Sequence, residues 1–69
     1  MSQQDQVIFY LKNHPEGLTT FEAFLALNIT KLNTRISELR SQGFIFNETW
    51  EKKNGKRFIR YKYVGVSHE

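Results

Sequence analysis

The 69-residue chain contains no cysteine, which excludes a disulfide framework, a thiolate zinc site and a cysteine nucleophile. No apolar run approaches the roughly 20 residues that span a bilayer. The first residues, MSQQDQV, hold neither the basic segment nor the apolar stretch of a secretory signal. We therefore expect a cytoplasmic protein that makes no membrane contact.

Residues that could support catalysis are equally scarce. The two histidines, His14 and His68, have no serine or aspartate partner nearby in the sequence. The carboxylates of Glu16 and Glu22 are explained by a turn and by a helix cap. The sequence has no glycine-rich phosphate loop and no cluster of metal ligands. We therefore expect no enzyme, no cofactor and no metal.

The length of the chain limits the number of domains. A chain of 69 residues supplies material for one hydrophobic core. The hydrophobic share of 39% and the charged share of 25% are ordinary for a globular domain. We predict a single domain over residues 1–64, with residues 65–69 as a frayed C-terminal tail.

Charge is unevenly distributed, although the formal net charge is only +3. Residues 1–29 carry one lysine against three acidic residues, a net charge of −2. Residues 30–69 carry nine basic residues against four acidic ones, a net charge of +5. No acid interrupts the basic residues between positions 52 and 62, which are Lys52, Lys53, Lys56, Arg57, Arg60 and Lys62. This asymmetry favours a polyanionic partner for the second half of the chain.

Capping patterns predict two helices in the first half. Ser2 precedes Asp5 by three residues and opens a helix that Asn13-His14-Pro15 ends. Thr19 and Glu22 form a better capping box, which opens a short helix of seven to nine residues. The large apolar side chains of this helix can share one face: Phe21, Phe24 and Leu25. Leu18, just before the cap, fits a one-rung strand or a hydrophobic staple.

A tight turn leads to a third predicted helix. Asn28 tolerates the left-handed conformation that such turns need. We predict Thr30 as the N-cap and a helix from about Lys31 to Gln42, ended by Gly43. One apolar stripe follows helical spacing on this segment: Leu32, Ile36 and Leu39.

After residue 43 the hydrophobic period becomes two, and Asn54-Gly55 separates a run over 44–53 from a run over 56–64. Asn-Gly between two such runs is the strongest short-range signal for a β-hairpin. With these two residues as the loop, alternation predicts a core face of Phe46, Trp50, Ile59, Tyr61 and Tyr63. The opposite face carries polar and basic residues together with Phe58 and Val64.

The order of elements predicts an α+β fold of the winged helix-turn-helix type, with three helices followed by a two-stranded hairpin, the wing. The stretch ITKLNTRISELR (29–40), then Gly43-Phe44, the NGKR turn (54–57) and Arg60-Tyr61 resemble small helix-turn-helix domain proteins of bacteriophages, prophages and other mobile elements. The resemblance covers about residues 6–64. It implies DNA binding through the third helix and the wing.

The third helix supplies the first set of candidate contacts. In such motifs the second helix of the pair enters the major groove amino end first. The candidates lie opposite and beside the apolar stripe: Thr30, Lys31, Asn33, Thr34, Arg35, Ser37 and Arg40. Asn33 suits adenine, Lys31 or Arg35 suits guanine, and Thr34 suits a thymine methyl group. Ser37 and Arg40 lie farther along the helix and suit phosphate. The alternative is a solvated face on which Glu38 pairs with Arg35 or Lys31.

The wing supplies the second set of candidate contacts, which suit the phosphate backbone or the minor groove of DNA. Its candidates are Lys52, Lys53, Asn54, Lys56, Arg57 and Arg60. The alternative is a hairpin that its charges keep soluble. Basic residues interleaved with aromatics also suit a platform for single strands, but a chain this short needs its aromatic side chains in the core.

These patterns predict sequence-specific binding to double-stranded DNA in a bacterial host cell, as a transcriptional regulator or an excisionase-like accessory factor. The alternative function is a protein-binding module that inhibits or redirects a host nucleic-acid-processing protein. Its contact surface would be seeded by Phe44, Phe58 and Val64. We expect a monomer or a weak homodimer, because no additional helix is available for a dimer seam.

Overall fold

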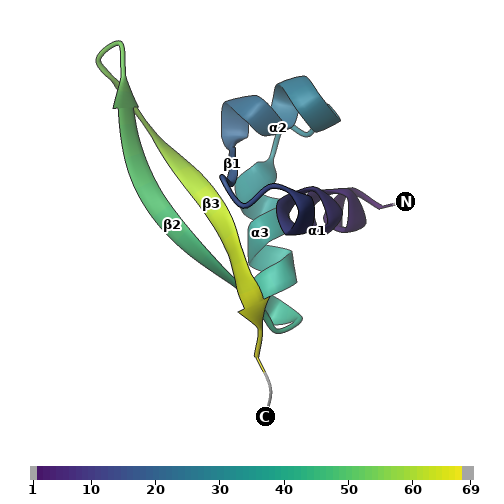
Figure 1. The fold of residues 1–69 in the computed structure, drawn as a ribbon. Helices are drawn as coiled ribbons and strands as arrows, with labels where there is room; N and C mark the ends of the chain where they lie inside the picture. The colour runs from purple at the N-terminus through teal and green to yellow at the C-terminus, as the bar shows by residue number, and fades with distance from the viewer. Residues whose placement is uncertain (1, 68–69) are drawn as a thin grey trace.

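The computed structural model describes residues 2–67. Its elements are α1 (Gln3–Asn13), β1 (Leu18–Thr19), α2 (Thr20–Leu27), α3 (Leu32–Ser41), β2 (Phe44–Lys53) and β3 (Lys56–Val66). The three helices gather beside the hairpin of β2 and β3, whose turn end extends away from α3 (Figure 1). The α+β class and the order of helices and hairpin are confirmed.

The sheet has three strands, in the order β1-β3-β2, rather than the predicted two. Leu18 and Thr19 pair antiparallel with Tyr61 and Arg60 of β3. The chain enters β1 through Gly17, whose φ is 89°. A Cβ atom at this position would lie 2.5 Å from the carbonyl oxygen of Tyr61. The added strand therefore depends on a residue without a side chain.

The helix starts agree with the capping patterns in two cases of three. The Ser2 hydroxyl accepts a hydrogen bond from the Asp5 amide, and Thr19 and Glu22 make both bonds of a capping box. The predicted cap at Thr30 is wrong. The N-cap of α3 is Lys31, which makes no side-chain cap, while its carbonyl accepts from the two amides three and four residues later. The turn is one residue longer than predicted, so Thr30 lies one residue before the N-cap.

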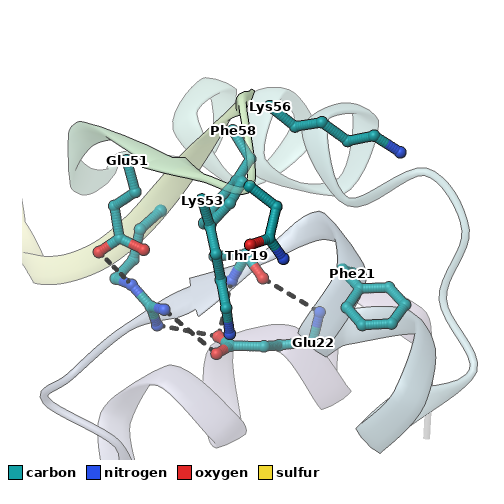
Figure 2. A pocket seen from close by; sticks show the side chains of 9 residues that line it. Thr19, Phe21, Glu22, Glu51, Lys53, Lys56 and Phe58 are labelled. Carbon is teal, nitrogen blue, oxygen red and sulfur yellow. Dashed lines mark hydrogen bonds and ion pairs between the residues drawn. The ribbon is translucent and has the colours of Figure 1, made fainter.

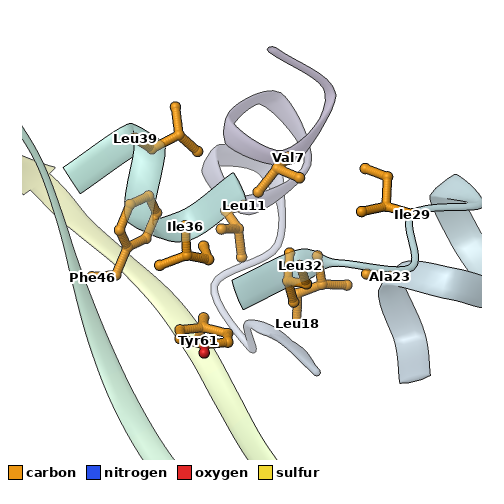
Figure 3. Close-up of a cluster of buried hydrophobic side chains, with 10 residues drawn as sticks. All are labelled: Val7, Leu11, Leu18, Ala23, Ile29, Leu32, Ile36, Leu39, Phe46 and Tyr61. Atoms are coloured by element: carbon orange, nitrogen blue, oxygen red, sulfur yellow. The ribbon is translucent and has the colours of Figure 1, made fainter. Parts of the chain in front are cut away.

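The core is a single cluster in which α3 packs between α1 and the base of the sheet (Figure 3). The predicted stripe on α3 is confirmed, since Leu32, Ile36 and Leu39 are all buried. The other members come from every remaining element and from the turn before α3: Val7, Leu11, Leu18, Ala23, Ile29, Phe46 and Tyr61.

Helix α2 faces the core through Ala23 and, at its end, through the partly buried Leu27. Ala23 is its one buried residue, whereas Phe21, Phe24 and Leu25 are 68%, 45% and 69% exposed. These three side chains do share one side of the helix, but it is the outer side. Ala23 permits a close approach of α2 to the core, and Ile29 in the following turn supplies the apolar volume there.

The register of the hairpin is the one that the Asn54-Gly55 loop predicts, from Phe46 opposite Tyr63 to Lys53 opposite Lys56. A bulge between Ile45 and Phe46 shifts the pairing near the base. The strand then continues through Gly65 and Val66, two residues into the predicted tail. The last two residues of that tail lie outside the described part of the chain.

The predicted core face of the wing is correct at its base and wrong at Trp50. Phe46 and Tyr61 are buried, and Ile59 and Tyr63 pack against the core. Trp50 is 63% exposed. It lies four residues from Phe46, about 13 Å along the strand, at a level where α2 lies beside the opposite face of the hairpin.

An ion-pair network joins α2 to the middle of the wing (Figure 2). The Arg60 guanidinium on β3 lies 2.9 Å from the carboxylate of Glu22 on α2 and 2.9 Å from that of Glu51 on β2. Burial tends to raise the pKa of Glu22, but hydrogen bonds from Arg60 and from the Thr19 amide lower it below its ordinary value. Hydrogen bonds to the carboxylates of Glu51 and Glu22 raise the pKa of the Arg60 guanidinium.

Substitution of the two large aromatic residues on one face of β2 tests where the core ends. Phe46→Ala is expected to lower the free energy of unfolding by about 3 kcal/mol, because it opens a cavity in the core. Trp50→Ala is expected to change it by less than about 0.5 kcal/mol. Urea unfolding followed by far-ultraviolet circular dichroism measures both. Comparable losses in the two variants would contradict the described boundary.

Glu22→Gln tests the network, because it keeps a side-chain acceptor for the Thr19 amide and removes the charge. The variant should be less stable by about 0.5–1 kcal/mol at neutral pH, as expected for a partly exposed ion pair. A carboxyl group whose pKa is lowered by folding stabilises the folded state fully when the pH is above its ordinary pKa of 4.5. This contribution is lost as the pH falls through the lower pKa that the group has in the folded state.

The stability difference between wild type and Glu22→Gln should therefore shrink on acidification. Urea unfolding at a series of pH values measures it. A double-mutant cycle with Arg60→Met isolates the pair. A difference that is constant down to strongly acidic pH would contradict this account.

Candidate nucleic-acid interface

The arc of α3 opposite the buried stripe is polar. At about 100° per residue it holds Thr34, Ser37 and Ser41, with Asn33 on one side of it and Glu38 on the other. Thr34 is half-buried, whereas Ser37, Ser41 and Asn33 are exposed. Thr30 and Lys31 lie exposed just before the helix begins. Small hydroxyl and amide side chains permit a close approach of another molecule to this arc.

Arg35 marks the side of α3 that faces α1. Its guanidinium forms an ion pair with Glu38 at 2.9 Å and donates to the side-chain oxygen of Gln3 at 3.3 Å. The side chain is 25% exposed. The pairing of Glu38 with Arg35, which the solvated-face alternative expects, is present, and Arg35 lies at the edge of the polar arc.

Arg40 marks the opposite side of α3, which faces the wing. It donates to the Phe46 carbonyl at 3.3 Å and to the Glu48 carboxylate at 3.4 Å. The side chain remains partly exposed. Arg40 thereby connects the polar arc of α3 to the strand that leads outward along the wing.

The wing tip concentrates cations around a tight turn. Asn54 and Gly55 form the turn with positive φ values of 54° and 77°. The adjacent cross-strand pairs are Lys52 opposite Arg57 and Lys53 opposite Lys56. All of these residues are exposed, and like charges directly opposite each other destabilise a hairpin. The tip is therefore a site where an anion would relieve repulsion.

Arg60 lies in a different environment from the other predicted wing residues. Its side chain is 17% exposed and lies between the two carboxylates of the network. The structure thus brings five of the six predicted wing residues together at the tip, and Arg60 lies in the internal network.

Trp50 joins the cations of the wing, although its place in the sequence pattern points to the core. The Arg57 guanidinium carbon lies 5.3 Å from the centre of the Trp50 ring, a cation–π contact. Strand alternation puts Trp50 on the same face as Arg57, Lys52 and Glu48. The signal in the sequence is the length of the hairpin, which exceeds what three short helices can cover.

Residues 2–67 hold no group of three or more histidine or acidic side chains arranged to bind a metal ion. No helix among them is long and apolar enough to cross a membrane.

A family model described as a winged helix-turn-helix domain matches residues 2–63. No curated protein and no solved structure matches the chain. Domains of this kind are DNA-binding modules, in which one helix enters the major groove. The chain belongs to the winged helix-turn-helix domain family.

Proposed function

We propose that this protein binds specific sites on double-stranded DNA, with α3 in the major groove and the wing on the sugar–phosphate backbone. The observation that carries the proposal is the arrangement of Lys52, Lys53, Lys56 and Arg57 as two like-charge pairs at the wing tip. Within residues 2–67, none of the four forms an ion pair. Phosphate groups of DNA would supply the missing counter-charge. When the four side chains neutralise these phosphates, the cations condensed on the DNA are released.

The residues of α3 would divide between bases and backbone. Those near the amino end, Lys31, Asn33 and Thr34, face base edges if the helix enters the groove by that end. Asn33 suits adenine and Thr34 suits a thymine methyl group. Arg35 would need to leave Glu38 before it could contact guanine. Ser37 and Arg40 lie farther along the helix and suit phosphate.

In a cell this binding would serve a bacteriophage or another mobile element as transcriptional regulation, or as an excisionase-like accessory role in recombination. The alternative, a module that redirects a host nucleic-acid-processing protein, needs no affinity for duplex DNA. Binding to the promoter and attachment DNA of the element that encodes the chain therefore separates the two functions. A stoichiometric host partner without duplex binding would support the alternative.

Arg57→Ala tests the contact between wing and phosphate. The slope of log binding constant against log salt concentration should become shallower by about one unit, because one phosphate contact is lost. Electrophoretic mobility shift across a salt series measures it. Lys12→Ala on α1 removes the same charge at the base of the hairpin, where Lys12 lies over the rings of Phe44 and Tyr63 and away from the wing tip, and should leave the slope unchanged. Salt-insensitive binding by the wild type would contradict the proposal.

Trp50 offers a direct optical test, because it is the only tryptophan in the chain. We expect duplex DNA to change its emission intensity or wavelength. Trp50→Ala should weaken duplex binding about two- to fivefold through loss of the contact that holds Arg57 in place. Phe9→Ala, which removes another exposed aromatic side chain on α1, should leave affinity unchanged. Duplex binding with unchanged emission would exclude the Trp50 face of the wing from the interface.

A further inference from the structure

A hollow separates α2 from the tip half of the wing (Figure 2). Its volume is about 690 Å³, and sites for small molecules commonly measure about 300–1,000 Å³. Phe21 and Glu22 line it from α2, and alternate residues of β2 and β3 line it from the wing. We call it the α2–wing hollow. The proposed contact with DNA gives it no role.

Strand alternation divides the cations of the wing tip between the two faces of the hairpin. Lys53 and Lys56, which are directly opposite each other, line the α2–wing hollow. Lys52 and Arg57 form the other pair and lie on the opposite face, where Arg57 contacts Trp50. Like charges directly opposite each other destabilise a hairpin. An anion within the hollow would therefore relieve the repulsion between Lys53 and Lys56.

The two carboxylates that line the hollow are already paired. Glu22 and Glu51 each lie 2.9 Å from the Arg60 guanidinium. Within residues 2–67, neither Lys53 nor Lys56 forms an ion pair. A cationic ligand would meet two ammonium groups and only occupied carboxylates. An uncharged ligand would remove water from the ammonium groups without replacing it. The charges of the lining therefore favour an anion.

Two aromatic rings line the hollow together with these ammonium groups. Phe21 projects from α2 and is 68% exposed, and Phe58 projects from β3 and is half-buried. A flat ring gains contact with such side chains in offset-stacked or edge-to-face geometry. A bare inorganic anion would leave both phenyl rings in water. The lining as a whole therefore suits a molecule that combines a ring with a negative charge.

We propose that the α2–wing hollow binds a small aromatic anion, such as an aryl carboxylate. The ring lies against Phe21 and Phe58, and the anionic group lies between Lys53 and Lys56. The bound molecule connects α2 to the wing tip, and it neutralises one of the two like-charge pairs.

A titration with 2-naphthoate tests the site without DNA. A ligand of about 13 non-hydrogen atoms is expected to bind an open hollow with a dissociation constant on the order of 1 mM. Amide resonances of ¹⁵N-labelled protein should shift in a saturable way at Phe21, Lys53, Asn54, Lys56 and Phe58. The absence of saturable shifts up to about 10 mM, or shifts confined to other elements, would overturn the proposal.

Two compounds separate the contributions of ring and charge at matched ionic strength. The ring without the charge is 2-naphthalenemethanol, and the charge without the ring is acetate. Each should bind at least about fivefold more weakly than 2-naphthoate, because each lacks one of the two contacts. Equal binding of 2-naphthalenemethanol would show an apolar surface only. Equal binding of acetate would show a general anion surface only, and either result would overturn the proposal.

Matched variants test the residues that line the hollow. Phe21→Ser and Lys56→Gln should each weaken 2-naphthoate binding about three- to fivefold. Leu25→Ser changes a side chain that is 69% exposed on the same helix but outside the hollow, and it should retain the affinity. Lys52→Gln makes the same charge change on the opposite face of the hairpin and should also retain it. Equal losses in the control variants, or unchanged affinity in both test variants, would contradict the assignment.

The proposed function gives the bound anion a consequence, because Lys53 and Lys56 are among the residues assigned to phosphate. This second step rests on the proposed function, and the first does not. Saturating 2-naphthoate should make the salt dependence of duplex binding shallower by up to about two units, and 2-naphthalenemethanol should leave it unchanged.

The outcomes of the two experiments are distinguishable. Absence of duplex binding by the wild type would end the proposed function and leave the titration result standing. Duplex binding without a response to 2-naphthoate in the titration would end the proposal for the hollow alone. An unchanged salt dependence with 2-naphthoate bound would overturn the competition with phosphate.

Discussion

The packing of α3 between α1 and the base of the hairpin is the interaction on which the other features depend. Leu32, Ile36 and Leu39 bury one side of this helix in the core. The other side is left as a polar arc whose edges are set by Arg35 toward α1 and Arg40 toward the wing. A chain of this length has one such core, so the same three side chains stabilise the fold and orient the surface proposed to meet DNA.

The sequence predicts the local structure well, because the signals that determine it are local. Thr19 and Glu22 carry their own capping geometry, and Asn54-Gly55 sets the register of the whole outer hairpin. Sequence periodicity shows which residues share a side of an element, but not which side is buried. That limit explains α2, where one alanine faces inward, and Trp50, which follows the core alternation beyond the end of the core.

The candidate site was predictable in composition and less so in detail. The tip residues are together as expected, because a two-residue turn forces neighbouring positions to face each other. Arg60 could not be separated from them by sequence, since its two carboxylate partners come from different elements. Cations near the core thus find internal partners, as Arg35, Arg40 and Arg60 do, while the tip remains positive.

The hairpin is supported at one end only. Its base is held by the core, and its middle is held by the Arg60 network, while its tip beyond Glu51 faces α2 across an open hollow. In mechanical terms the wing is a cantilever, with a stiff root and a compliant free end. Bending or twisting of that end disturbs few buried contacts, so its movements have a low energetic cost. On a duplex, α3 would fix the register while the wing followed variation in groove width along the DNA.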